Sequence, residues 1–340
     1  MSAPPEINFL KLCMIGCGEH AESSHGPAQS RYAAKHVGTE LAGCCDLDAA
    51  RAERHRQRFG FARAYTDVAA MLDAEKPDAA VLAVPVHRTA PVGAPLLERG
   101  VPLLIEKPPG RTVQEVDALI AAAERNGRRV PHQVAFNRRF VPIVAEARRR
   151  LAALGPPTEI QHLHYEMTRV DRRDPDFSTT AIHGLDAVRF LGGADYAGAR
   201  LRYHEQPALG PGVAHMFVDA VLTSGATAHL AFCPTAGAVV ERAAVHASGQ
   251  TFFLRIPMWG PLDAPGHLQH VDRGEVVADL AGDQLGGASD VCVLGGFYGE
   301  YEAFLGDLAA GRTPSPSLRE SRQSVEIAEC LRRRDEEFHA

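Results

Sequence analysis

The chain carries the stretch LKLCMIGCGEHA at residues 10–21, in which an apolar segment leads directly into a glycine-rich turn. The six residues 10–15 form a run of the length and composition of a buried strand. The next six, Gly16-Cys17-Gly18-Glu19-His20-Ala21, fit the spacing G-x-G-x-x-(G/A), and a helical pattern follows from residue 21 to about residue 36. A strand, a tight glycine turn and a helix in this order predict the start of a βαβ unit.

Glycine is required in this motif for two physical reasons. Gly16 permits the tight turn, and Gly18 lets a phosphate group approach the main chain closely. Glu19 and His20 then lie at a helix N-terminus, where free N–H groups and the positive end of the helix dipole favour an anion. The motif therefore predicts a site for the pyrophosphate of a dinucleotide, and a glycine-rich turn without a ligand is the alternative.

An acidic residue follows the second apolar run, residues 40–45, which predicts a second strand ending at Asp46. A carboxylate at this point accepts hydrogen bonds from the adenosine ribose hydroxyls. Asp46 comes 28 residues after Gly18, further than the usual ~20, and a longer first helix accounts for the difference. The alternative is that Asp46 only caps the next helix. Because Leu47 follows, and because a carboxylate repels a 2′-phosphate, the sequence favours NAD over NADP.

The first 130 residues alternate short apolar runs with helical patterns, which is typical of a parallel sheet covered by helices. Later segments alternate with period two between short turns, which indicates a largely antiparallel sheet. We therefore expect an α/β protein with a parallel, helix-covered sheet over residues 1–130 and a largely antiparallel sheet in residues 131–340. Expected strands are residues 10–15, 40–45, 79–84, 101–105, 129–136, 158–169, 199–205, 213–222, 226–233, 241–247 and 251–256. Expected helices are residues 21–36, 49–59, 68–74, 91–99, 113–125, 142–154, 179–191, 297–310 and 318–334.

The composition excludes several classes of protein. With 42 acidic and 36 basic residues the formal charge is −6, which argues against a nucleic-acid partner. No apolar run approaches the ~20 residues of a membrane span, and the polar segment Met1–Asn8 is no secretory signal. The seven cysteines show no CxxC and no paired Cys/His spacing, so we expect neither disulfides nor a metal site. These features together predict a reduced, soluble, cytoplasmic protein.

A lysine motif ends the strand expected at residues 101–105, where the sequence continues Glu106-Lys107-Pro108. Ligands of α/β sheets bind at this end of the strands. Together with the glycine motif, Asp46 and Ala83-Val84-Pro85, this motif closely resembles the Gfo/Idh/MocA family of NAD(P)-dependent oxidoreductases. The resemblance continues through residues 137–142, 182–191 and 297–331, and so covers nearly the whole chain. It implies a doubly wound Rossmann domain over residues 1–130 and an α+β domain with a large, mostly antiparallel sheet over residues 131–340, whose last helices pack back on the first domain.

The resemblance implies roles for residues of the first domain. Lys107 would lie beside the nicotinamide and the reacting oxygen of the substrate, and its ammonium would polarise a carbonyl or hold a developing alkoxide. Val84, Pro85 and Glu106 would belong to the cofactor site. Without the motif, an ordinary lysine at a strand end would be the better interpretation of Lys107.

The family's second catalytic group is a histidine that follows an aspartate by four positions on a helix of the second domain. His183 matches the histidine, and Thr179 stands in place of the aspartate. Because Thr179 lies on the same helix face, it would still face the substrate, as a neutral hydrogen-bonding group. A structural histidine is the alternative for His183. Asp186 either orients this imidazole or is a surface charge, and Arg138 and Arg139 either bind a substrate carboxylate or phosphate or form a solvated pair.

The resemblance predicts an oxidoreductase that moves a hydride between nicotinamide C4 and a secondary alcohol or ketone of a sugar, cyclitol or related polyol. Lys107 would hold the oxygen and His183 would exchange the proton. The exposed face of the second sheet would make a homodimer or homotetramer. Two alternatives stay open: an NAD-dependent glycosidase that uses transient oxidation, and a nucleotide-binding sensor without turnover.

Overall fold

The computed structural model describes residues 10–340, so the expectation for Met1–Asn8 lies outside the described residues. The chain divides into two compact units. Unit 1 contains residues 10–136 and Phe297–Arg322, and unit 2 contains Asn137–Gly296 and Gln323–Ala340. The segment that follows residue 296 therefore returns to the first unit before the chain ends in the second.

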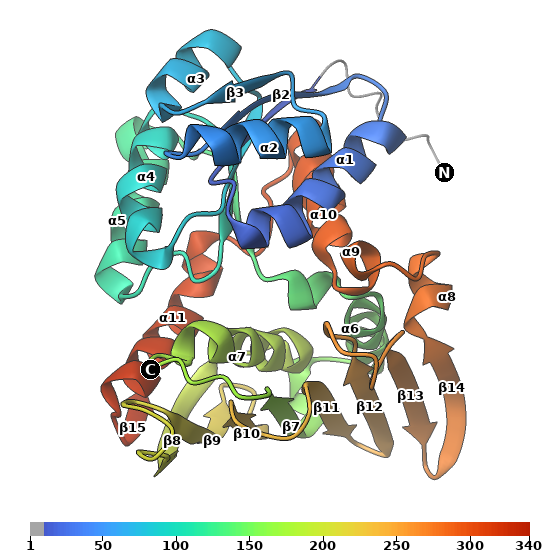
Figure 1. The fold of residues 1–340 in the computed structure, drawn as a ribbon. Helices are drawn as coiled ribbons and strands as arrows, with labels where there is room; N and C mark the ends of the chain where they lie inside the picture. The colour runs from blue at the N-terminus through green and yellow to red at the C-terminus, as the bar shows by residue number, and fades with distance from the viewer. Residues whose placement is uncertain (1–9) are drawn as a thin grey trace. The chain divides into compact units, whose positions relative to one another are not determined.

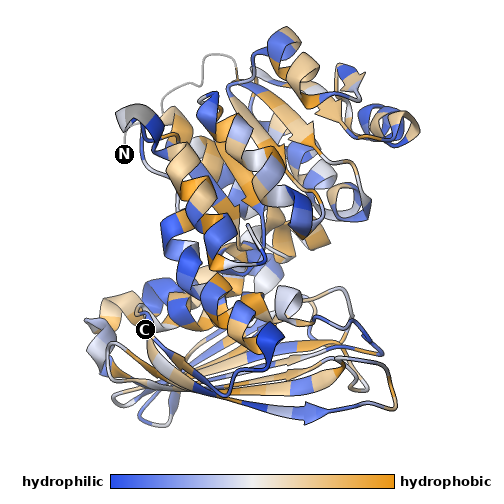
Figure 2. Ribbon diagram, turned by 90° about the vertical axis from the view of Figure 1, so that its left-hand side faces the viewer, coloured by the Kyte–Doolittle hydropathy of each residue, from blue (hydrophilic) through white to orange (hydrophobic). Residues whose placement is uncertain are grey.

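Unit 1 is built on a six-stranded sheet with the order β3-β2-β1-β4-β5-β6 (Figure 1). All neighbouring strands are parallel, and the order reverses between β1 and β4, as in doubly wound dinucleotide-binding sheets. Figure 2 shows mainly hydrophobic strands here, as expected for a sheet buried on both faces. The Rossmann prediction is confirmed. Its strands are β1 (Leu10–Ile15), β2 (Thr39–Cys45), β3 (Arg63–Tyr65), β4 (Ala79–Leu82), β5 (Leu103–Glu106) and β6 (His132–Ala135).

The helices of unit 1 begin largely where capping side chains predict them. Asp48, Asp67 and Thr112 each accept a hydrogen bond from a main-chain N–H in the first turn of the helix that follows. The first helix starts with a π-helical segment before it becomes α-helical. The helices are η1 (Ala21–His25), α1 (Gly26–Lys35), α2 (Ala49–Phe59), α3 (Val68–Glu75), α4 (Val86–Glu98), α5 (Val113–Ala123), η2 (Arg125–Gly127), α10 (Phe297–Ala309) and the first part of α11 (Leu318–Arg333).

One helix of unit 1 starts earlier than the sequence predicts. The expected start at Pro91 is wrong, because α4 begins at Val86, directly after Pro85, and contains both Pro91 and Pro95. Proline usually marks a helix start, since it lacks the N–H that later turns need. The helix tolerates these two prolines, whose buried neighbours, among them Leu96 and Leu97, pack in the core.

Unit 2 is built on a nine-stranded sheet with the order β14-β13-β12-β11-β7-β10-β9-β8-β15. Every pair is antiparallel except β10 with β7, which agrees with the predicted mostly antiparallel sheet. Strands β13, β14 and β15 are additions to the prediction. The strands are β7 (Ile160–Thr168), β8 (Tyr196–Glu205), β9 (Ala214–Leu222), β10 (Thr227–Cys233), β11 (Val240–Ala247), β12 (Gln250–Ile256), β13 (His267–Asp272), β14 (Glu275–Ala281) and β15 (Glu337–His339).

Helix α7 (Ser178–Gly192) lies along one face of this sheet (Figure 1). It packs closely because of Gly184, where an added Cβ would lie 2.7 Å from the Phe232 ring and 2.8 Å from the Tyr165 ring. The contact holds the helix over β7 and β10, and thereby fixes the position of His183. The other helices of unit 2 are η3 (Asn137–Phe140), α6 (Pro142–Leu154), η4 (Pro157–Glu159), α8 (Gly282–Gly286), α9 (Val291–Leu294) and the last part of α11.

A buried ion cluster joins η3 to the sheet of unit 2. Arg138 donates from Nε to Glu241 Oε2 at 3.0 Å and from Nη2 to Oε1 at 2.7 Å, and Arg169 also donates to this carboxylate. All three side chains are almost fully buried. Burial alone would raise the pKa of Glu241, but the two guanidinium groups lower it to about 2. Arg138 is therefore not a solvated residue, and the expectation of a solvated pair is wrong for it.

Glu241→Gln is expected to lower the free energy of unfolding at pH 7 by about 2 kcal/mol. This is less than the ~3–5 kcal/mol typical of breaking a buried pair, because glutamine keeps one acceptor oxygen. In the wild type, a carboxyl with a depressed folded-state pKa stabilises the fold above its unfolded-state pKa, and this contribution is lost as the pH falls toward about 2. Urea denaturation at pH 7 measures the stability lost by the substitution, and the same experiment at pH 4 measures the pH dependence of the wild type. The exposed Glu275→Gln is the control. Equal stability of Glu241→Gln and Glu275→Gln at pH 7 would contradict the prediction.

Among residues 10–340, no helix has the length and apolar character that a membrane span requires.

Candidate active site

The glycine motif forms the turn between β1 and the first helix, and its two glycines meet different surroundings. Gly16 has φ +89°, and an added Cβ would lie 2.1 Å from the carbonyl oxygen of Ala83. Only glycine fits at that point, where the end of β1 passes the end of β4. At Gly18 an added Cβ would meet no atom within 4 Å. The main chain at Gly18 is thus open to a ligand, as the phosphate role predicted for it requires.

Asp46 is directed at the glycine motif. Its Oδ2 accepts a hydrogen bond of 2.9 Å from the backbone N–H of Cys17, and its Oδ1 accepts one of 3.0 Å from the N–H of Asp48. Arg51 Nη1 lies 3.4 Å from the same Oδ1. Helix α2 is capped by Asp48, whose side chain accepts from Ala50 and Arg51. The alternative that Asp46 serves only as this cap is wrong.

The other predicted cofactor residues follow neighbouring strands of the same sheet. Val84 and Pro85 follow β4 after one intervening residue, Ala83, and Val84 Cγ1 would lie 3.0 Å from a Cβ on Gly16. Glu106 is the last residue of β5, and the half-buried Lys107 follows it. The carboxyl ends of β1, β2, β4 and β5 therefore carry the glycine turn, Asp46, Val84-Pro85 and Lys107. In open α/β sheets this edge is the ligand-binding edge.

Glu106 is held by two histidines of the helix that follows the glycine turn. His20 Nε2 lies 3.0 Å and His25 Nε2 lies 2.9 Å from the same carboxylate oxygen, Oε1. Burial raises the pKa of the Glu106 carboxyl, but the charge and hydrogen bonds of the two imidazoles outweigh burial and hold this pKa well below its ordinary value. Glu106 is therefore an ionised carboxylate at neutral pH.

In unit 2, helix α7 carries both residues of the predicted proton-transfer pair. His183 is buried, and Thr179 lies one helical turn before it and is half-buried. Thr179 Oγ1 donates to the carbonyl oxygen of Asp176 at 3.2 Å. The hydroxyl thus bonds to the preceding turn, and Thr179 supplies no carboxylate to the histidine.

Asp186 and Arg139 form an ion pair with each other. Arg139 donates from Nε to Asp186 Oδ2 and from Nη2 to Oδ1, both at 2.7 Å, and the carboxylate is fully buried. The interpretation of Asp186 as a surface charge is wrong. The bidentate pair joins η3 to α7, so it fixes the helix that carries His183.

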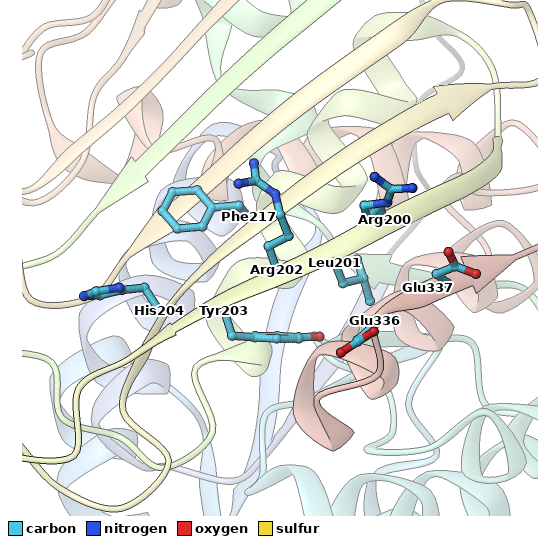
Figure 3. A pocket seen from close by; sticks show the side chains of 8 residues that line it. All are labelled: Arg200, Leu201, Arg202, Tyr203, His204, Phe217, Glu336 and Glu337. Carbon is cyan, nitrogen blue, oxygen red and sulfur yellow. The ribbon is translucent and has the colours of Figure 1, made fainter.

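A separate hollow of about 580 Å³ lies at the β8–β9 edge of unit 2. Figure 3 shows the eight side chains that line it, among them Arg200, Arg202 and Tyr203. None of the predicted site residues lines this hollow, so it forms no part of the candidate active site.

Residues 10–134 match the family model described as "Oxidoreductase family, NAD-binding Rossmann fold", Gfo/Idh/MocA. Inositol 2-dehydrogenase 4 of Saccharopolyspora erythraea is 30% identical over 218 residues, which are 59% of this chain and 60% of that protein. Residues 10–134 are thus similar to the NAD-binding Rossmann domain of the Gfo/Idh/MocA oxidoreductases. D-apiose dehydrogenase of Paraburkholderia graminis is 34% identical over 158 residues, 44% of this chain and 39% of that protein. The alignments thus span 60% and 39% of the lengths of these two curated relatives.

Solved structures of similar fold cover nearly the whole length of this chain. Levoglucosan dehydrogenase, in complex with NADH and L-sorbose, has a TM-score of 0.82 at 17% identity and covers 98% of this chain and 99% of its own. An oxidoreductase domain protein of Kribbella flavida has a TM-score of 0.78 at 19% identity, with the same coverage. These likenesses show that the chain has the same fold as these two proteins over nearly its whole length.

The sequence analysis missed one residue of the site, His25. It is fully buried, and it contacts Glu106 through Nε2 and Tyr301 Oη through Nδ1 at 2.8 Å. His25 stands five residues after His20, a spacing that places two side chains on different faces of an α-helix. Helical periodicity could not have paired them, because the local helix is of the π type.

Proposed function

We propose that the chain is an NAD-dependent oxidoreductase that transfers a hydride between nicotinamide C4 and a secondary alcohol or ketone carbon of a sugar, cyclitol or related polyol. The observation that carries this proposal is the common edge of the parallel sheet, where the open Gly18 turn, Asp46 and Lys107 follow adjacent strands. The relatives named inositol 2-dehydrogenase and D-apiose dehydrogenase support the substrate class.

Each site residue has a chemical task in this proposal. NAD supplies the hydride acceptor when it is bound. The N–H groups of the Gly16–His20 turn hold the pyrophosphate, and Asp46 accepts hydrogen bonds from the ribose hydroxyls. Lys107 donates a hydrogen bond to the reacting oxygen of the substrate, where negative charge develops in the transition state. His183 accepts the hydroxyl proton during oxidation and returns it during reduction.

A single set of measurements tests this function against the two alternatives. The purified protein is mixed with NAD and a panel of sugars and cyclitols, and both NADH absorbance and cleavage of aryl glycosides are followed. Net NADH formation supports the dehydrogenase. Release of the aglycone without net NADH would identify a glycosidase, and ligand binding without either reaction would identify a sensor. Each of these last two results would contradict the proposal.

The cofactor preference follows from the Asp46 carboxylate, and we expect NAD to bind at least ~10-fold more tightly than NADP. Asp46→Ser should relax this preference, because it removes the charge that repels a 2′-phosphate and releases Arg51, which lies 3.4 Å from Asp46. Titrations of both cofactors against wild type, Asp46→Ser and Asp46→Ser/Arg51→Ala measure the effect. The double variant should lose the gained NADP affinity. Equal affinities in the wild type would reject the assignment.

We propose that the protein assembles as a homodimer or homotetramer through the sheet face of unit 2 that helices α6 and α7 leave open (Figure 1). Val221, Phe253 and Val276 expose apolar side chains on strands of this sheet. Burying such residues against a second copy is favourable.

A cytoplasmic location is proposed from the cysteines: all seven lie within residues 10–340 and all are free thiols. The partner of the active site is the small-molecule substrate, with no nucleic acid or membrane involved.

A further inference from the structure

Three side chains of unit 1 converge on one point. His20 Nε2, His25 Nε2 and Glu106 Oε1 all lie within 4.8 Å of one another, and both nitrogens are directed at the same oxygen. The three residues come from the glycine motif, from the end of the π-helical segment and from the end of β5. This is the one group of histidines and carboxylates among residues 10–340 with the spacing of metal ligands.

The π-helical segment is the reason that the two histidines meet. In an α-helix, residues five apart differ by about 140° around the axis. Residues 21–25 instead form a wider turn, in which the N–H of Gly26 donates to the carbonyl oxygen of Ala21, five residues earlier. This geometry brings His20 and His25 to one side, with ring centroids 5.4 Å apart. Such π-turns are rare and often occur at functional sites.

The remaining ring nitrogens have the partners that metal-bound histidines usually have. Tyr301 Oη lies 2.8 Å from His25 Nδ1, and Ser24 Oγ lies 3.4 Å from His20 Nδ1. An outer hydrogen bond of this kind fixes the tautomer and aims Nε2 at the ion.

We propose that His20, His25 and Glu106 form a binding site for a divalent transition-metal ion such as Zn²⁺. Two ligand atoms that each lie ~2.1 Å from one tetrahedrally coordinated ion are about 3.4 Å apart. The two observed N···O separations, 3.0 and 2.9 Å, lie within about 0.5 Å of this value. Two imidazoles and one carboxylate are a donor set that suits Zn²⁺. The His20 side chain is 42% exposed, which gives the ion a way in and leaves positions for water.

The test measures Zn²⁺ binding to the full chain by isothermal titration calorimetry, after treatment with EDTA and without nucleotide. Co²⁺ absorption spectra report the coordination. The wild type should bind one Zn²⁺ at this site, and His20→Ala and Glu106→Gln should each weaken that binding at least ~10-fold. His20 is half-exposed and Gln matches Glu in shape, so both variants should fold, which circular dichroism verifies. The matched control is His36→Ala, which removes a histidine 3.2 Å from a different glutamate, Glu302.

Two results would overturn the metal site. The first is that His20→Ala does not weaken Zn²⁺ binding, or that the wild type binds no Zn²⁺. The second is that the wild type and Glu106→Gln bind Zn²⁺ equally. Either result would leave the cluster as hydrogen bonds that anchor Glu106 beside Lys107. Because the titration contains no NAD and no substrate, its failure does not affect the proposed dehydrogenase function, and a loss of dehydrogenase activity would not affect the metal site.

Discussion

Lys107→Met is expected to lower kcat for polyol oxidation by ~10²–10³-fold, the typical cost of removing one donor from a developing oxyanion. The affinity for NAD should change by less than about tenfold, because the pyrophosphate and ribose contacts proposed at Gly18 and Asp46 do not involve this side chain. Methionine keeps the length and apolar stem of lysine and removes only the ammonium. Steady-state kinetics and NAD titration by fluorescence measure the two quantities separately.

The control for this variant is Lys76→Met, at the exposed C-terminal end of α3. It removes the same charge at a position away from the carboxyl ends of the strands, so its kcat should equal that of the wild type. A Lys107→Met enzyme with full turnover would show that Lys107 does not act on the substrate. A loss of NAD binding that matches the loss of turnover would instead assign Lys107 to the cofactor alone.

The sequence correctly predicted that the glycine turn, Asp46 and Lys107 follow strands of one parallel sheet, because this arrangement depends on local chain geometry. Residue 16 must be glycine because the turn passes so close to the main chain of Ala83 that a Cβ atom would not fit. Buried strands flanked by glycine and by helix caps give strong local signals. The residues after β1, β2, β4 and β5 therefore could be assigned to one edge of a sheet from their order alone.

The parts that sequence reasoning missed depend on side-chain partners far apart in the chain. No local pattern pairs Arg139 with Asp186 or Arg138 with Glu241, since both pairs form through the tertiary fold. His25 was missed because a π-turn alters the helical spacing. Strands β13 and β14 follow the irregular segment after β12, and the apolar–polar alternation of their residues is too weak to predict them.

His183→Asn is expected to reduce turnover by ~10²–10⁴-fold, the usual contribution of a general acid or base. Asparagine is close to histidine in size and polarity, so the buried position on α7 should stay packed. NAD binding should persist, because the glycine turn and Asp46 belong to unit 1. The matched control is His339→Asn, whose side chain is 80% exposed.

The pH profile separates a catalytic role of His183 from a structural one. A base must be neutral to accept a proton, so the wild-type rate of alcohol oxidation should fall as the pH drops and the imidazole becomes protonated, whereas ketone reduction should favour the protonated form. The residual oxidation by His183→Asn should lack this acid limb. Thr179→Asp, with an ionised carboxylate one turn away, would favour the protonated imidazole and move the limb to higher pH. If His183→Asn keeps both the rate and the pH profile of the wild type, then the proton is taken by another group, and Lys107 or a water molecule becomes the base to test.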